Sequence, residues 1–378
     1  MERVVVAGVG IHPFGRFDAD YRQIGAVAAR GALDDAGVTL AEVDLVFAAN
    51  VNAEMAKGHN VIEQIGRTGV PIVNVEAACA SSASSLMLAS QFIERGAART
   101  VLCVGFEKAP KGFIANCGYE RWQNESGMGI NPIYFALQAQ ELLEQTDATV
   151  EDLADVSVKN HRHAVHNPNA MYRKEVTREQ VLASPMVCPP LNLLMLCAPN
   201  EGGAAAVLMD KDEARRRNIA DPVRLAAVSV VSRAPDDFFL PAASFQTESR
   251  TNLTARAAHG AFEQAGIGPS DVNLVECQDT DSGSELIAYR DLGLCPPGDE
   301  AKLLRSGATE LGGAQPVNVS GGLLSKGEPL GASGLGQLHE LVRQLQGRSG
   351  PRQVAGARVG MGHVMGAGGT VGVLVVAR

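Results

Sequence analysis

A single cysteine stands where a strand-like run meets a helix built from small residues. Cys79 follows the strand-like residues 73–76 and precedes the small, helix-forming residues 80–94. A thiol at the start of a helix faces the positive end of the helix dipole, which favours the nucleophilic thiolate. Cys79 is therefore a candidate for covalent catalysis. A cysteine that only packs against the helix is the alternative, and the local pattern does not decide between the two.

Two glycine-rich segments hold the next candidates. Residues 320–334 include Glu328 and lead into a helix pattern, without a Walker or dinucleotide motif. Residues 360–369 include His363 and lie just before the last strand pattern. Glycines allow positive φ and a close approach of backbone N–H groups to a ligand. A histidine held in such a loop can act as acid or base, although each loop could also be a structural turn.

Short apolar runs alternate with helix patterns along the chain. We expect strands over residues 4–9, 43–49, 101–106 and 370–377, and a helix over 21–36 that ends at Gly37. Alternating strands and helices predict an α/β fold with a parallel or mixed sheet covered by helices.

An internal repeat is visible in the sequence. Residues 29–38 resemble 258–267, 43–46 resemble 272–275, and 73–76 resemble 317–320. Because the segments recur in the same order, we expect two similar α/β halves, residues 1–220 and 221–378. Chance similarity between alanine-rich helices is the alternative. Residues 110–190 have no counterpart in the second half, which predicts an inserted segment that carries binding loops.

Composition excludes several classes of protein. The 378 residues are 46% hydrophobic with a net charge of −9, and no block of Lys and Arg stands out. A nucleic-acid partner is therefore not expected, and no apolar run reaches the length of a membrane span. Seven cysteines without a CxxC pair, and no leader pattern before the first strand, predict reduced thiols in a cytoplasmic protein.

Together these segments resemble the thiolase superfamily, most closely the sterol-carrier-protein-type thiolases. Residues 105–112, 159–168 and 202–208 also look like that branch. The resemblance implies a five-layer αβαβα sandwich of two βαβαβαββ halves with an inserted loop domain. It further implies a dimeric or tetrameric assembly, and it agrees with the internal repeat.

The resemblance also assigns roles. Cys79 matches the nucleophile that accepts the acyl group and passes it to CoA, which is a substrate rather than a tightly bound cofactor. Backbone N–H groups of Cys79 and of residues 363–366 match the oxyanion hole. The inserted segment would bind CoA. The candidate substrate and oxyanion residues are Gly366, Gln278, Asp279 and Ser333.

This sequence departs from the family pattern at two motifs. The Gly-His-Pro motif reads Gly-Glu-Pro at residues 327–329, and the branch's His-Asp-Cys-Phe motif reads Gln-Asp-Thr-Asp at 278–281. An imidazole, and the cysteine that acts as acid and base in the branch, are thus missing; the displaced Cys277 should not inherit that role. His363 matches the histidine of the branch's C-terminal His-Asn motif.

Activation of Cys79 therefore falls to His363 or Glu328. An imidazole has a pKa near 6.5, closer to that of a thiol than a carboxylate's. We predict that His363 is the main partner of Cys79 and that Glu328 orients substrate or water. A strong rise in the pKa of Glu328 on burial would reverse the two roles. His161, His163 and His166 belong to the loop-domain motif, so no metal site is expected.

The expected activity is CoA-dependent cleavage, or Claisen formation, of a 3-oxoacyl-CoA through an acyl-Cys79 intermediate. The altered motifs favour a branched, aromatic or dicarboxylic acyl group. Two alternatives remain: a CoA-thioester aldolase of the same fold, and a weakly catalytic scaffold in a larger complex. Expected partners are a second copy of the chain and a small OB-fold/zinc-ribbon subunit.

Overall fold

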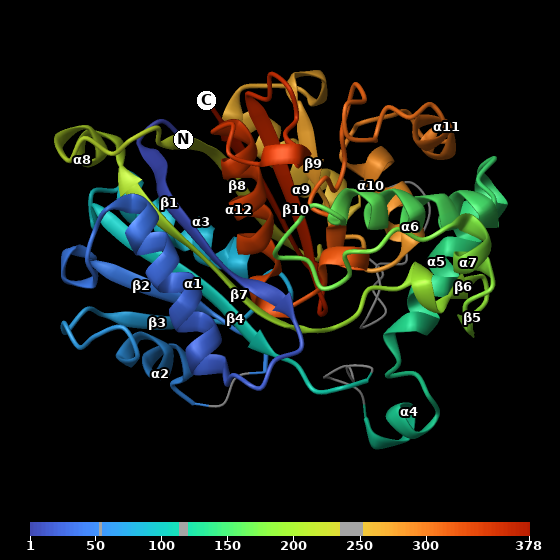
Figure 1. The fold of residues 1–378 in the computed structure, drawn as a ribbon, viewed down its shortest axis with the longest axis horizontal. Helices are drawn as coiled ribbons and strands as arrows, with labels where there is room; N and C mark the ends of the chain where they lie inside the picture. The colour runs from blue at the N-terminus through green and yellow to red at the C-terminus, as the bar shows by residue number, and fades with distance from the viewer. Residues whose placement is uncertain (53–54, 113–119, 235–251) are drawn as a thin grey trace.

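The computed structural model describes residues 1–52, 55–112, 120–234 and 252–378. Nine strands form one twisted sheet in the order β3-β2-β4-β7-β1-β8-β11-β10-β9 (Figure 1). Their bounds are β1 Val4–Gly15, β2 Leu45–Ala49, β3 Ile72–Val75, β4 Thr100–Lys108, β7 Glu201–Asp210, β8 Val223–Ser232, β9 Leu274–Glu276, β10 Val359–Gly366 and β11 Thr370–Ala377.

The N-terminal half contributes the five strands from β3 to β1. Helices α1 (Tyr21–Ala36) and α2 (Lys57–Glu63) cover the outer face of this part. Helix α1 begins where the side chain of Asp20 caps the first turn, and it ends at Gly37, whose φ of 63° suits glycine. The predicted helix over 21–36 is confirmed. Strand β1 runs beyond the predicted 4–9, whereas β2 begins at Leu45, two residues after the predicted start.

The C-terminal half repeats the same topology, which confirms the internal repeat. Strands β8, β11, β10 and β9 follow one another as β1, β7, β4 and β2 do in the first half. Val317 forms a parallel bridge to Val275 of β9, in the position that β3 takes beside β2. Helix α9 (Leu253–Ala265) ends at Gly266 with φ 70°, just as α1 ends at Gly37.

Two helices lie between the halves and complete the five layers. Helix α3 (Ser81–Glu94) packs against β4 of the first half and β8 of the second. Helix α12 (Ser333–Leu345) packs against β7 and β10 in the same way. The sheet divides into two β layers at β1 and β8, which pair only through Val5 with Arg224 and Val6 with Val223. With α1 and α9 outside, the layers follow the predicted αβαβα order (Figure 1). The small residues of α3 fit this central position because both of its sides are covered.

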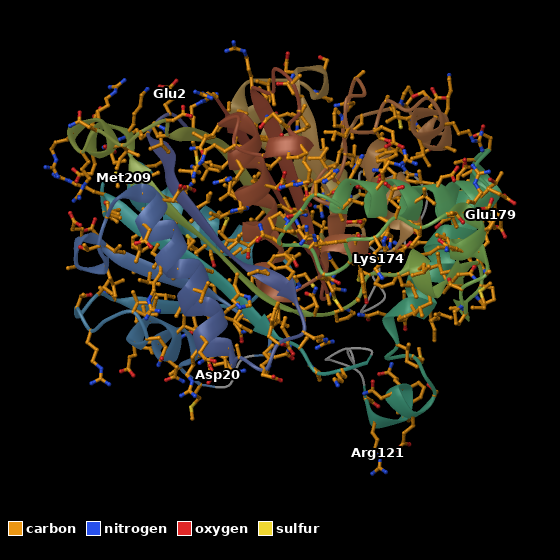
Figure 2. All side chains as sticks on the ribbon, in the orientation of Figure 1. Glu2, Asp20, Arg121, Lys174, Glu179 and Met209 are labelled. Atoms are coloured by element: carbon orange, nitrogen blue, oxygen red, sulfur yellow. The ribbon has the colours of Figure 1, made fainter. Side chains whose placement is uncertain are left out.

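The chain leaves the sheet between β4 and β7, which are themselves antiparallel neighbours. This excursion holds α4 (Arg121–Glu125), α5 (Asn131–Gln145), α6 (Val150–Ala164), α7 (Arg178–Leu182), β5 (Met186–Cys188) and β6 (Leu191–Asn192). Helices α5 and α6 pack against α10 (Ser282–Asp291) of the C-terminal half. Arg121 and Glu179 lie on the outside of the excursion (Figure 2). Residues 113–119 of the expected insertion, with Cys117, lie outside the described residues, and the domain boundaries at 220 and 190 stay predictions.

The remaining elements are short. They are α8 (Lys211–Arg216), α11 (Glu300–Arg305), the π-helical turn η4 (Gly322–Lys326) and the 3-10 turns η1 (Leu40–Glu42), η2 (Leu193–Met195), η3 (Pro269–Asp271), η5 (Leu330–Ala332) and η6 (Gly350–Arg352). Within the described ranges, no helix has the length and apolar character needed to cross a lipid bilayer.

Candidate active site

Cys79 lies in a tight turn between β3 and α3. Ala78 adopts a φ of 50°, and the N–H of Ala80 donates to the carbonyl of Ala77 at 3.1 Å. Cys79 thus stands just before the first turn of α3 and keeps part of its surface exposed. Gly366, at the end of β10, packs directly on this turn, because a Cβ there would lie 2.3 Å from the Ala77 oxygen. The structure therefore brings these two predicted residues together.

Glu328 reaches the same place from the segment between η4 and α12. Its backbone is paired with the strand-like residues 198–200: the N–H of Asn200 donates to the Glu328 carbonyl at 3.2 Å. Gly327 adopts a φ of 110°, and a Cβ there would lie 1.6 Å from Nδ2 of Asn200. Only glycine fits this position, and the Glu328 side chain that follows is 4% exposed.

The Glu328 carboxylate holds two thiols. The Sγ of Cys197 donates to Oε2 of Glu328 at 2.9 Å, and Cys79 also hydrogen-bonds to this carboxylate. Burial raises the pKa of Glu328, and the two thiol hydrogen bonds oppose that rise. Burial and then the charge of Glu328 raise the pKa of Cys79 well above its usual range; Cys197 responds in the same way. A base is thus paired with two protonated thiols.

Gln278 fixes the carboxylate from its other side. Its Nε2 donates to Oε1 of Glu328 at 3.3 Å and to the carbonyl of Met365 at 2.9 Å, while its Oε1 accepts from the Met365 N–H at 2.6 Å. Gln278 therefore ties the end of β10 to Glu328. The sequence placed it among the substrate or oxyanion residues; its contacts make it a positioning residue for the carboxylate.

His363 has other partners. Its Nδ1 accepts from the N–H of Gln278 at 3.5 Å, and its Nε2 lies 3.2 Å from Oγ1 of Thr254. These contacts assign a neutral ring that carries its proton on Nε2. Burial lowers the pKa of His363 to about 4. Cys79 therefore interacts with Glu328, whereas the hydrogen-bond partners of His363 are Thr254 and Gln278.

The carboxylate of Asp279 caps the turn η4. Its carboxylate accepts from the N–H groups of Leu323 at 2.6 Å and Leu324 at 3.2 Å, and from Nδ2 of Asn160 at 2.8 Å. Burial, and then the charge of Glu285, raise the pKa of Asp279 well above its usual range. These contacts, with two backbone N–H groups and the Asn160 side chain, give Asp279 a structural position.

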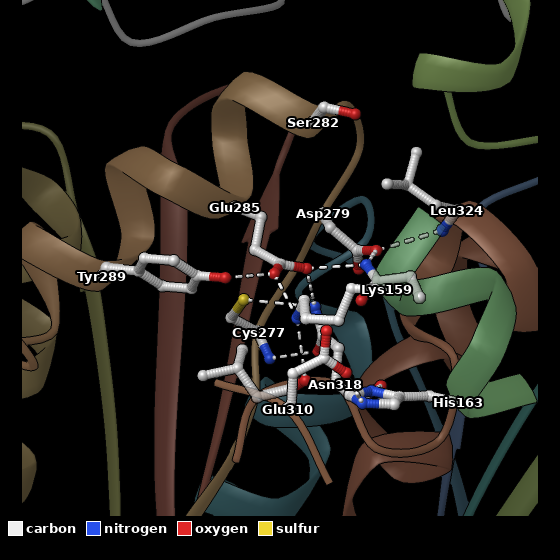
Figure 3. Close-up of polar contacts among 12 residues, drawn as sticks. Lys159, His163, Cys277, Asp279, Ser282, Glu285, Tyr289, Glu310, Asn318 and Leu324 are labelled. Atoms are coloured by element: carbon white, nitrogen blue, oxygen red, sulfur yellow. Dashed lines mark hydrogen bonds and ion pairs between the residues drawn. The ribbon is translucent and has the colours of Figure 1, made fainter. Parts of the chain in front are cut away.

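A buried polar network continues from Asp279 (Figure 3). Nζ of Lys159 lies 2.6 Å from Glu285, and both side chains are at most 1% exposed. Glu285 also accepts from Asn160 and Asn318 at 2.7 Å each and from the hydroxyl of Tyr289. Burial, the largest single effect, raises the pKa of Glu285, but the charge of Lys159 and the hydrogen bonds from Lys159, Tyr289 and Asn160 together hold that pKa below its usual range. The network joins α6, α10 and the segment after Val317.

Two more side chains complete the surroundings. Ser333 begins α12, and its buried Oγ has no hydrogen-bond partner among the described residues. Glu107, at the end of β4, accepts from the N–H groups of Val51 at 3.0 Å and Gly331 at 3.3 Å. Its charge adds to the rise in the pKa of Cys79. Glu107 thus ties the loop after β2 to η5, beside the nucleophile.

The sequence missed Cys197 and Glu107 as site residues. Glu107 was part of a family-like motif, but nothing in its spacing pointed to Cys79. Cys197 lies 118 positions from Cys79 and 131 from Glu328, and no local pattern brings such distant residues together. Over the described part of the chain, no group of three or more His, Cys, Asp or Glu side chains is arranged to hold a metal ion.

Comparisons with known proteins match this architecture. The model of the thiolase N-terminal domain matches residues 4–184, and that of the thiolase C-terminal domain-like family matches residues 242–377. The chain belongs to the thiolase family. Sterol carrier protein 2 of Bos taurus is 35% identical over 98% of this chain and 71% of its own length.

Two further relatives match along almost their whole length. Acetyl-CoA acetyltransferase of Methanothermobacter thermautotrophicus is 35% identical over 100% of this chain and 100% of its own length. Benzoylsuccinyl-CoA thiolase subunit BbsB of Thauera aromatica is 34% identical over 97% of this chain and 95% of its own. The solved Ltp2-ChsH2(DUF35) aldolase superposes with a TM-score of 0.87 at 22% identity, over 99% of this chain and 98% of that chain. That last likeness supports the thiolase fold alone.

Proposed function

We propose that this thiolase-family chain is an acyl-CoA C-acyltransferase that cleaves or forms a carbon–carbon bond through a thioester on Cys79. The observation that carries the proposal is the position of Cys79 just before α3, at a residue that keeps part of its surface exposed and whose thiol interacts with the buried carboxylate of Glu328. A nucleophile beside a base is the arrangement that covalent acyl transfer requires. The relatives whose names denote an acetyltransferase and a thiolase support the same class.

Glu328 takes the role of the base that activates Cys79. Burial raises the pKa of Glu328, which makes this carboxylate a stronger base than an exposed one. His363, by contrast, has a pKa near 4 and is therefore a poor proton acceptor at neutral pH. This assignment exchanges the roles that the sequence suggested for the two residues.

The oxyanion of the tetrahedral intermediate would be held by backbone N–H groups. The N–H of Cys79 at the beginning of α3 and that of Gly366 are the candidates, because Gly366 packs on the turn that carries Cys79. Such donors act strongly where water is excluded. CoA is the proposed acyl acceptor, and no tightly bound cofactor is part of the proposal.

The proposed substrate is a 3-oxoacyl-CoA with a branched, aromatic or dicarboxylic acyl group. Glu328 stands where the family carries a histidine, and a negative charge changes which polar groups the site can accept. We also propose a small OB-fold/zinc-ribbon partner. The relative from Thauera aromatica is named as a subunit, and the aldolase structure is named with a second component.

Trapping the acyl-enzyme tests the proposal. Purified protein would be mixed with acetyl-CoA, succinyl-CoA and benzoyl-CoA, quenched in acid and examined by peptide mass spectrometry. An acyl group on the peptide that holds Cys79, absent in Cys79→Ala and present in the control Cys295→Ala, is the expected result. Cys295 lies near α11 and away from the site, so its loss should leave acylation intact. The absence of acylation by every one of the three thioesters would contradict the proposal.

The aldolase alternative has one observation in its favour. The thiol of Cys79 has a raised pKa, and Glu328 could instead take the proton of a substrate hydroxyl, which is what retro-aldol cleavage requires. That reaction needs no acyl-cysteine. Cleavage of a 3-hydroxyacyl-CoA that Cys79→Ala retains, without any acylation of the wild-type protein, would favour this alternative.

A further inference from the structure

We propose that Cys197 is a second catalytic thiol, the acid that gives a proton to the α-carbon when the carbon–carbon bond breaks and takes it back in the reverse direction. This inference rests on the acyl-transfer function proposed above, and it concerns a residue to which the comparisons assign no role. Its starting observation is the 2.9 Å hydrogen bond from Sγ of Cys197 to Oε2 of Glu328, the carboxylate that also holds Cys79.

The backbone around Cys197 fixes its thiol firmly. The N–H of Cys197 donates to the carbonyl of Thr280 at 2.9 Å, and Leu196 forms an antiparallel bridge to Asp281. On the other side Pro199 forms a parallel bridge to Glu328. The segment is therefore held between the residues that follow β9 and the one that carries the carboxylate. A catalytic group needs such positioning, because errors near 1 Å slow a reaction substantially.

Access distinguishes Cys197 from the structural thiols. Cys197 and Cys79 both keep part of their surface exposed, whereas Cys103 and Cys277 are buried. Cys103 donates only to the carbonyl of Ser85, and Cys277 accepts from Asn318 in the network of Figure 3. Cys197 is thus a residue that both contacts the proposed base and keeps part of its surface exposed. Burial and the charge of Glu328 raise the pKa of Cys197, and the charge of Cys79 adds to that rise.

The protons balance with these three groups alone. Glu328 takes the proton of Cys79, whose sulfur bonds to the 3-keto carbon of the substrate. The bond between that carbon and the α-carbon breaks, and its electron pair moves to the α-carbon, which receives the proton of Cys197. Glu328 then returns its proton to Cys197. The shorter acyl-CoA leaves, Cys79 holds the other acyl group as a thioester, and the carboxylate is free to deprotonate incoming CoA.

Two half-reactions separate the two thiols. Acylation of Cys79 by acetyl-CoA, propanoyl-CoA or succinyl-CoA needs no carbanion, whereas exchange of their α-protons in D2O needs an acid and base at the α-carbon. Acylation would be measured by mass spectrometry and exchange by proton NMR. The variants are Cys197→Ala, Cys197→Ser and Cys79→Ala, with Cys295→Ala as the control. Serine keeps a donor for Glu328 but is a far weaker acid than a thiol.

We expect both Cys197 variants to lose α-proton exchange by about 10²–10⁴-fold, the usual contribution of a general acid, while Cys197→Ser acylates at a rate close to wild type. Cys79→Ala should show the converse, with exchange retained and acylation lost. Three results would overturn the inference. They are α-proton exchange that persists in Cys197→Ser, a wild-type protein that shows no exchange, and a Cys197→Ser variant that loses both half-reactions equally. Exchange that depends on Cys197 without any acylation of Cys79 would instead overturn the proposed function and leave the role of Cys197 standing.

Discussion

At the scale of single residues, the site depends on one carboxylate in an unusual position. The carboxyl group of Glu328 is buried, and its partners among the described residues are two thiols and the amide of Gln278. Such a group is costly for folding but useful as a base, since burial raises its affinity for a proton. The same burial weakens the basicity of His363. One physical effect, burial, thus moves the pKa values of the two residues in opposite directions and supports the roles proposed for them.

The first prediction concerns the ionisation of Cys79. Because the charge of Glu328 helps to hold the thiol protonated, Glu328→Gln should lower the apparent pKa of Cys79, measured as the pH dependence of alkylation by iodoacetamide. Acylation by acyl-CoA should nevertheless fall by about 10²–10⁴-fold, because the base is lost. His363→Ala serves as the comparison and should leave the alkylation profile nearly unchanged. A shifted profile in His363→Ala alone would restore the assignment suggested by the sequence.

The second prediction concerns stability. Glu328 has a raised pKa in the folded state, so the folded protein binds its proton more tightly than the unfolded chain does. Its contribution to stability is therefore present at low pH and lost as the pH rises through the raised pKa. The Gln side chain of Glu328→Gln does not ionise, so the variant avoids the cost of a buried charge at neutral pH. It should therefore melt at a higher temperature than wild type at neutral pH. The difference should shrink towards acidic pH. A variant less stable than wild type at neutral pH would contradict the argument.

At the scale of elements, a buried polar network next to the site joins α6, α10 and the turn η4. Lys159 and Glu285 are its charged centre, and Asp279 connects it to the backbone of η4. Helix α6 belongs to the excursion between β4 and β7, so the network also attaches that excursion to the C-terminal half. Loss of the cation would leave a carboxylate uncompensated in the interior, which is among the most costly changes a core can suffer.

The third prediction tests that attachment. Lys159→Met should lower the free energy of unfolding by about 3–5 kcal/mol, as expected when one partner of a buried ion pair is removed. Arg121→Met breaks the exposed pair with Glu125 and should change stability by about 0–1 kcal/mol. Denaturant titrations of both variants provide the comparison. A double variant with Glu285→Gln should recover part of the loss; no recovery would mean that Lys159 acts through packing instead.

The elements were more accessible to sequence reasoning than the site. Local periodicity predicts the helix over residues 21–36, and β-branched content predicts the strand over 370–377. The recurrence of residues 29–38 later in the sequence predicts that the second half has the same fold as the first. Cys79 could be found because its helix follows it directly. The pairing of Glu328 with Cys197 could not, since it depends on the bridge of Pro199 to Glu328 across the fold. The pKa of a side chain depends on its burial, which local sequence does not show.

At the scale of the whole molecule, two equivalent halves meet through their central helices. The start of α3 carries Cys79, and the start of α12 carries Ser333; the hydroxyl of Ser82 ties the two starts together through the Gly331 carbonyl. The active site therefore lies where the internal repeat brings two helix N-termini together. The first half supplies the proposed nucleophile and the second half supplies its proposed base, so we expect neither half to be active alone.

The last prediction is the dimer. Strand β3 is an edge of the nine-stranded sheet, paired with β2 along one side, and its Val73 is 43% exposed. An uncovered edge of this kind offers free backbone groups to a second copy. Light scattering should therefore give twice the chain mass. Val73→Lys should weaken the dimer, and because β3 runs straight into the turn of Cys79, acylation should weaken with it. Val27→Lys on the outer helix α1, at a residue with 46% exposure, is the matched control and should change neither property. A Val73→Lys protein that remains dimeric and fully active would place the interface elsewhere.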